Sequence, residues 1–159
     1  MTKILLSGLP GGGKTRLGDT LAADYGFLHT DMEADSWALA EAHRDSGAFL
    51  GVFPHDRDVV LTWGFQPLAS LHVVQVLVRG GFTPVWLDGN QAHFFASFMR
   101  REHGDPIMAA CYHQQLGRIT EARVLEVIDW CIVDPFQPDG TFRPPNEIAA
   151  EIIKVAPPS

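Results

Sequence analysis

Eight residues near the start of the chain, Gly8 to Thr15, carry glycine, lysine and threonine at the spacing that binds phosphate groups. They read G-L-P-G-G-G-K-T and match G-x-x-x-x-G-K-[ST] at every fixed position. Glycines allow positive φ angles and let backbone N–H groups approach phosphate oxygens closely. The lysine can reach the β- and γ-phosphates, and the threonine hydroxyl can ligate magnesium. We therefore predict that ATP and Mg²⁺ bind here, with Thr15 as the metal ligand and with nucleotide contacts from Leu9, Pro10, Gly11, Gly12, Gly13, Lys14, Thr15 and Arg16.

Alternating strands and helices must position this loop. Short, apolar runs predict strands at residues 3–7, 26–29, 59–62, 84–87 and 130–133. Longer helix-like stretches between them cover residues 14–25, 34–44, 67–79, 91–103, 121–127 and 146–154. This order predicts an α/β fold of three layers, in which a five-stranded parallel sheet has helices on both faces. Ligands of such sheets bind at the carboxyl ends of the strands, so we expect functional residues directly after each strand.

Composition narrows the classes of partner. The 159 residues fit one domain over 1–159, and we expect residues 156–159 to fray. The net charge of −7 argues against a nucleic-acid backbone as the main partner, because that contact needs a basic surface. No apolar run approaches the roughly 20 residues of a membrane span, so we expect a cytoplasmic protein that meets no membrane. Cys111 and Cys131 have no metal-ligand spacing and are expected to be buried free thiols.

An acid follows the second predicted strand, in the run F-L-H-T-D at residues 27–31. With this run and the glycine loop, the chain resembles the small P-loop kinases, particularly the shikimate kinase and gluconate kinase group, over nearly its whole length. The resemblance implies a P-loop NTPase fold with a small helical lid at about residues 98–120. It also implies that Asp31 orients the hydroxyl of a phosphate acceptor or takes its proton. The alternative is an exposed aspartate that caps the next helix. His29 departs from the acidic residue that shikimate kinases have at its position.

The third predicted strand ends at Thr62 and is followed by Trp63 and Gly64. Shikimate kinases have a glycine cluster here whose backbone faces the substrate, so the resemblance implies substrate contacts from Gly64 and Trp63. The alternatives are a glycine that begins a turn and a tryptophan that packs in the core. No acid follows Leu61, so this strand lacks the usual Walker B carboxylate. Asp88 after the fourth strand is an alternative metal residue, or else a turn residue.

Two adjacent arginines, Arg100 and Arg101, end the predicted helix at residues 91–103. Phosphoryl transfer spreads negative charge over oxygen atoms, and arginines commonly stabilise that charge. Gluconate kinases have a similar lid arginine followed by a glutamine-rich helix, and the chain has Gln114, Gln115 and Arg118 in that later stretch. The resemblance thus implies a catalytic role for Arg101 or Arg100, whose side chains point about 100° apart on a helix. The alternative is simple surface charge.

A proline-rich loop follows the fifth predicted strand. In the kinases that the chain resembles, a loop at this place packs on the adenine. The resemblance therefore implies that Arg143 stacks on the base and that Pro144 forms a wall of its pocket. The alternative is a rigid loop without base contact.

Together these residues favour transfer of the ATP γ-phosphate to a hydroxyl group of a small metabolite. Lys14 and a lid arginine would neutralise charge, and Asp31 would orient the acceptor. Arg44 is the only arginine in residues 34–53, which favours an uncharged sugar-like or nucleoside acceptor over shikimate. Other hypotheses remain: a nucleoside or nucleotide kinase, a non-kinase P-loop ATPase, or a nucleotide-binding switch. Monomer and homodimer are both open.

Overall fold

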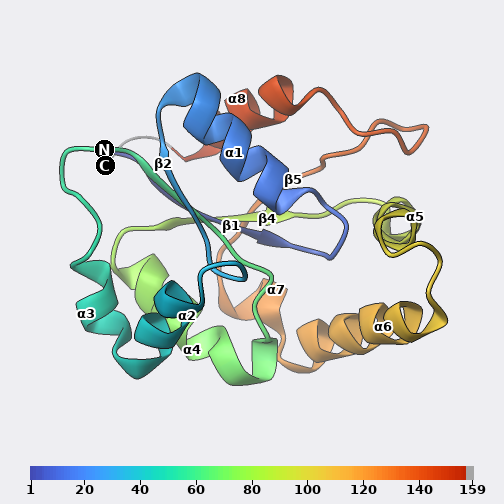
Figure 1. Cartoon of the computed structure of the whole chain (residues 1–159), viewed down its shortest axis with the longest axis horizontal. Coiled ribbons are helices and arrows are strands. Elements are labelled where there is room, and N and C mark those ends of the chain that lie inside the picture. Colours follow the sequence, from blue (N-terminus) through green and yellow to red (C-terminus); the bar gives the residue numbers. More distant parts are fainter. Residues whose placement is uncertain (157–159) are drawn as a thin grey trace.

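Five parallel strands form the centre of the computed structural model, which describes residues 1–156 (Figure 1). Their order across the sheet is β2-β3-β1-β4-β5. The strand that leads into the glycine loop is thus central, with Leu5 paired to Leu61 on one side and to Pro84 on the other. The bounds of the strands are β1 Lys3–Gly8, β2 Leu28–Asp31, β3 Val59–Thr62, β4 Thr83–Leu87 and β5 Cys131–Val133.

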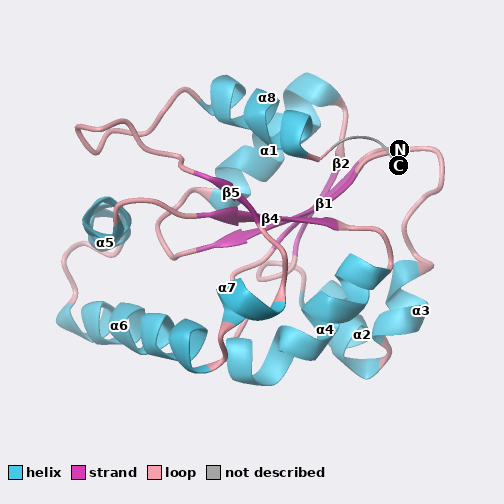
Figure 2. Cartoon of the chain, turned by 180° about the vertical axis from the view of Figure 1, so that it is seen from behind, coloured by secondary structure: helices cyan, strands magenta, loops and turns pink. Residues whose placement is uncertain are grey.

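Helices cover both faces of the sheet, as the sequence predicts (Figures 1 and 2). One face carries α1 (Lys14–Tyr25) and α8 (Pro145–Val155). The opposite side carries α2 (Ser36–Arg44), α3 (Ser46–Leu50), α4 (Pro67–Arg79) and the short α7 (Val124–Val127). Two further helices, α5 (Gln91–Arg101) and α6 (Pro106–Glu121), lie toward the carboxyl ends of the strands. The predicted three-layer α/β fold is confirmed.

Coverage on both faces explains why the strand sequences are almost continuously apolar. Leu5 in β1 and Leu61 in β3 are fully buried, and so is Leu87 at the end of β4. Local signals set the helix ends. The Asp35 carboxylate accepts a hydrogen bond from the Ala38 amide and caps α2.

The structure corrects several boundaries. The second strand begins at Leu28 rather than at residue 26, because Gly26 closes α1 with a φ of 76°. Asp31 therefore ends β2 instead of lying in the loop beyond it. The prediction of helices also missed α3, whereas α6 lies where a helical lid was expected, at about residues 98–120, although no bounds were predicted for it. Ala156 is fully buried, while the rest of the expected frayed end, 157–159, lies outside the described residues.

Two further sequence expectations concern thiols and membranes. Cys111 is exposed and Cys131 is only partly covered, so the prediction of buried thiols is wrong. The reason for the first is that Cys111 faces a pocket from α6. Among the described residues, no helix has both the length and the apolar character that a membrane span requires.

Candidate nucleotide and acceptor site

The glycine loop leaves β1 at Gly8 and enters α1 at Lys14. Gly11 and Gly13 have φ angles of 87° and 78°, which side-chain-bearing residues rarely adopt. A Cβ atom on Gly11 would also lie 2.4 Å from the carbonyl oxygen of Phe94 in α5. The loop geometry therefore requires glycine at this position both for its backbone angle and for its closeness to α5.

Lys14 lines a pocket of about 460 Å³ together with Glu33, Gly64 and Arg101. Burial lowers the pKa of Lys14 from its ordinary value, and the Glu33 carboxylate opposes this most strongly. The Arg101 guanidinium lowers the pKa of Lys14 further, whereas Asp31 raises it. Two cations thus face one pocket in which bound phosphate oxygens would neutralise them.

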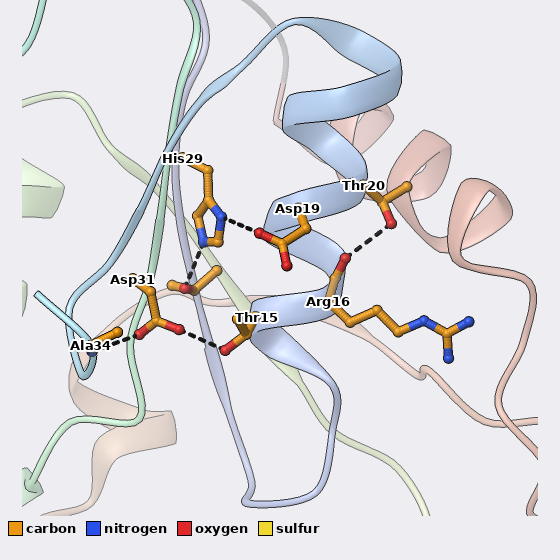
Figure 3. Close-up of polar contacts among 8 residues, drawn as sticks. Thr15, Arg16, Asp19, Thr20, His29, Asp31 and Ala34 are labelled. Atoms are coloured by element: carbon orange, nitrogen blue, oxygen red, sulfur yellow. Dashed lines mark hydrogen bonds and ion pairs between the residues drawn. The ribbon is translucent and has the colours of Figure 1, made fainter.

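Thr15 and Asp31 are joined across the gap between α1 and β2 (Figure 3). The Thr15 hydroxyl donates to Oδ2 of Asp31 at 2.7 Å. The other oxygen, Oδ1, accepts from the backbone amides of Glu33 at 2.9 Å and of Ala34 at 3.3 Å. Because its proton goes to Asp31, the Thr15 hydroxyl keeps its oxygen lone pairs for another partner.

These two oxygen-bearing side chains suit magnesium. Mg²⁺ prefers oxygen ligands, keeps several waters, and is usually held by one or two protein groups plus substrate phosphates. A larger cluster is therefore not needed, and within residues 1–156 no group of three or more His, Cys, Asp or Glu side chains is arranged to hold a metal ion. Thr15, with Asp31 behind it, is the pair that fits the predicted magnesium position.

Glu33 is the site residue that sequence reasoning missed. It lines the same pocket as Lys14, whereas Asp31 lines a neighbouring hollow beside the exposed Trp37. The Glu33 Oε2 atom accepts a hydrogen bond of 3.1 Å from the Gly64 amide, which fixes the carboxylate at the pocket wall. The available signal was a second acid two residues after Asp31, since the chain turns there and brings both acids near the loop.

Gly64 and Trp63 have different surroundings, although they were predicted together. Gly64 lines the pocket, and a Cβ atom there would lie 3.0 Å from the Glu33 carboxylate. Trp63 is only 3% exposed, and its indole ring packs edge-on against His43 in the core. We therefore assign Trp63 to the core, the alternative that the sequence left open.

Helix α6 forms the far wall of the pocket with polar side chains. The Gln115 amide donates to the carbonyl oxygen of Phe65 at 3.0 Å, and Arg118 donates to the side chain of Gln66 at 2.8 Å. Within residues 1–156, the Tyr112 hydroxyl and the Gln115 Oε1 atom are buried and have no hydrogen-bond partner. Burial raises the pKa of Tyr112 to about 12, so its hydroxyl stays protonated and can donate.

The two arginines at the end of α5 differ in direction. Arg101 lines the pocket, lies 5.2 Å from the centre of the Phe98 ring, and donates to Glu102 at 2.8 Å. Arg100 is exposed and is not part of the pocket wall. The pocket geometry thus favours Arg101 for contact with a phosphate.

The loop after β5 carries Arg143 and Pro144, the two residues for which base contacts are predicted. Arg143 donates to the carbonyl oxygen of Asp134 and to the Glu151 carboxylate in α8, each at 2.7 Å. Its guanidinium is thus engaged, and Pro144 caps α8 at an exposed position. The ring of Phe142 is 38% exposed and lies beside Gly13, where a Cβ atom would be 3.3 Å from it.

Two other residues considered from the sequence lie outside the pocket that Lys14 lines. Arg16 is exposed, and its carbonyl oxygen accepts from Thr20 within α1 (Figure 3). Asp88 lines a different pocket from Lys14 and accepts from the Gly89 amide at 2.8 Å. Asp88 therefore has the geometry of a turn residue, the alternative given for it above.

Known structures resemble this arrangement, although no protein-family model and no curated protein matches the sequence. A gluconokinase from Sinorhizobium meliloti 1021 aligns with 97% of this chain and 90% of its own, with a TM-score of 0.62 and 18% identity. The shikimate kinase from Bacteroides thetaiotaomicron aligns with 97% of both chains, with a TM-score of 0.64 and 15% identity. The chain has the fold of these small P-loop kinases.

The likeness extends to a structure with a bound substrate. Shikimate kinase from Acinetobacter baumannii in complex with shikimate aligns with 98% of this chain and 92% of its own, at a TM-score of 0.61 and 16% identity. At these identities the small P-loop kinase structures establish the fold, so the chemistry must be argued from the residues of the pocket.

Proposed function

We propose that the protein is an ATP-dependent kinase that transfers the γ-phosphate to a hydroxyl group of a small metabolite. The observation that carries this proposal is the convergence of Lys14, Glu33, Gly64 and Arg101 on one pocket at the end of the glycine loop. A cation pair beside a carboxylate is the combination that phosphoryl transfer needs, because the reaction depends on positioning and on charge stabilisation.

Each side chain has a distinct task in this proposal. Lys14 and Arg101 neutralise the charge that develops on the transferred phosphate. Thr15 provides an oxygen ligand for Mg²⁺, and Asp31 orients the Thr15 hydroxyl. A magnesium ion held through Thr15 would supply positive charge that offsets the charge of the phosphate groups. Glu33 accepts a hydrogen bond from the acceptor hydroxyl and orients its oxygen toward the phosphate, the task that the sequence assigned to Asp31.

The wall opposite the glycine loop supports a polyhydroxylated acceptor. Gln114 and Gln115 line it, and side-chain amides can donate to and accept from hydroxyl groups of a ligand. Arg118 adds a cation to this wall, so a carboxylate on the acceptor is acceptable there as well. This revises the preference for an uncharged acceptor that the sequence suggested.

The test is ADP release measured over an acceptor panel of gluconate, shikimate, neutral sugars and nucleosides. We expect turnover that depends on one acceptor, with Lys14→Ala inactive. We also expect Glu33→Gln to lower kcat/KM for the acceptor by about 100-fold, within the range typical for loss of one acid–base or orienting group. Asp31→Asn should instead raise the Mg²⁺ concentration that half-saturates the reaction.

Two outcomes would contradict the proposal. Steady ATP hydrolysis that no acceptor accelerates would favour a P-loop ATPase. Tight nucleotide binding without turnover on any acceptor would favour a switch. The control is Asp24→Asn, an exposed position near the end of α1, which should leave turnover unchanged.

A further inference from the structure

A second polar contact between α1 and β2 lies about one helical turn along α1 from the Thr15–Asp31 pair (Figure 3). His29 in β2 has Nδ1 at 3.0 Å from Oδ1 of Asp19 in α1 and Nε2 at 2.9 Å from Oγ1 of Thr62 in β3. The imidazole side chain is 10% exposed, and Thr62 is 1% exposed. One ring thus connects three elements that meet beside the glycine loop.

The partners determine the roles of both ring nitrogens. A carboxylate can only accept, so Nδ1 must carry the hydrogen that it donates to Asp19. In the neutral ring Nε2 then accepts the hydrogen of the Thr62 hydroxyl. Both contacts are satisfied at once, and the ring has one orientation that allows this.

The sequence of α1 makes room for this ring. A Cβ atom on Gly18 would lie 2.3 Å from Nε2 and 2.6 Å from Cε1 of His29. Glycine inside a helix is unfavourable by about 0.5–1 kcal/mol relative to alanine. Gly18 therefore lowers the stability of the helix, but it leaves space for the imidazole ring of His29.

The spacing links this contact to the magnesium position. Thr15 and Asp19 are four residues apart on one face of α1, and His29 and Asp31 are two residues apart on one face of β2. The two contacts therefore join the same helix and strand at neighbouring positions. The Thr15–Asp31 contact is exposed to water, whereas the His29 side chain in the second contact is shielded.

A contact that ties β2 to α1 matters because β2 lies at the edge of the sheet. It pairs with β3 alone, so no second strand restrains its distance from α1. We propose that His29, held by Asp19 and Thr62, is a positioning residue that keeps Asp31 beside Thr15 and so supports binding of magnesium with the nucleotide. This inference rests on the proposed nucleotide site, but it does not depend on which acceptor is phosphorylated.

The test compares Asp19→Ala with Asp24→Ala, a matched change at an exposed position of the same helix. ADP affinity is measured by calorimetry with Mg²⁺ and with EDTA. We expect Asp19→Ala to reduce the Mg²⁺-dependent gain in affinity by about tenfold, the lower end of the effect of groups that support metal ligands. Affinity in EDTA should stay within about twofold, and Asp24→Ala should change neither value.

Two additional variants separate positioning from a purely structural role. Thr62→Val, which keeps the shape of the buried side chain, should lower the Mg²⁺ gain as Asp19→Ala does. In an Asp31→Asn background, Asp19→Ala should have no further effect, because the effect passes through Asp31. An unchanged Mg²⁺ gain in both Asp19→Ala and Thr62→Val would overturn the proposal, and so would equal losses with and without Mg²⁺.

A measurement without nucleotide distinguishes this failure from failure of the proposed function. The Glu33 amide donates to Asp31, so its hydrogen exchange reports whether Asp31 stays in place. We expect exchange at this amide to be several-fold faster in Asp19→Ala than in Asp24→Ala, even if the wild type phosphorylates no acceptor. Identical exchange in both variants would show that His29 does not position Asp31.

Discussion

Gly18→Ala should destabilise the protein, although replacing a helix-interior glycine by alanine normally stabilises a helix. The new Cβ atom would lie 2.3 to 2.7 Å from three atoms of the His29 ring, against ordinary contact at 3.4 Å or more. The ring must therefore withdraw by about 1 Å. Its closest atom to the new methyl group is Nε2, so the hydrogen bond to Thr62 is the first contact to be lost.

The sizes of the opposing effects determine whether Gly18→Ala stabilises or destabilises the protein. Alanine should gain about 1 kcal/mol from helix propensity, but the displaced ring costs about 2 kcal/mol and the lost hydrogen bond about 1 kcal/mol. We expect a net loss of about 2 kcal/mol, which corresponds to a melting temperature lower by about 4–8 °C for a chain of this size.

Urea unfolding at neutral pH measures this loss, and two controls sharpen it. Gly117→Ala in α6 meets no atom within 4 Å, so it should stabilise by about 0.5–1 kcal/mol. In a His29→Ser background the ring is absent, and Gly18→Ala should become stabilising by a similar amount. If Gly18→Ala is as stable as Gly117→Ala in the wild-type background, His29 does not occupy the space beside α1.

Three further predictions concern the pocket. Arg101→Ala should lower kcat by about 100-fold or more, whereas Arg100→Ala, one residue away but outside the pocket wall, should change kcat little; equal effects would contradict the assignment. Lys14→Met should abolish turnover yet raise urea stability at neutral pH, because burial lowers the pKa of Lys14 and so penalises its charged form. The gain in stability of Lys14→Met should be complete below the lowered pKa and should vanish as the pH rises toward 10.5. A gain in stability that grows with pH would contradict the lowered pKa of Lys14. Tyr112→Phe should preserve stability within about 1 kcal/mol, since the buried hydroxyl has no partner in residues 1–156, and should leave KM for the acceptor unchanged because this hydroxyl is closed to solvent; a raised KM would show that the acceptor reaches it.

The glycine loop and the sheet were predictable because both depend on local sequence. The loop pattern fixes the residue type at Gly8, Gly13, Lys14 and Thr15, and buried parallel strands are continuously apolar. Helix α6, for which only an approximate helical lid was predicted, begins at Pro106, and the side chain of its N-cap Asp105 accepts from the Ile107 amide. These are ordinary helix-start signals, but most of α6 faces water or the pocket, so its apolar periodicity is weak.

The acceptor side of the site was harder to predict because it depends on contacts between distant residues. Glu33 reaches the pocket through a hydrogen bond from Gly64, 31 positions along the chain. The contact of Arg143 with Glu151 in α8 also depends on the fold rather than on the local sequence. In the same way, the partners of His29 on two other elements could not be read from its position in the sequence.

The glycine loop is also confined by atoms that have nothing to do with a nucleotide. A Cβ atom on Gly8 would lie 2.5 Å from the Leu87 carbonyl oxygen, and one on Gly12 would lie 2.8 Å from the Phe94 ring. The loop therefore packs closely against β4 and α5 in the absence of bound phosphate. Its amides need little ordering on binding, so the conformational entropy that a flexible loop would lose has already been lost during folding.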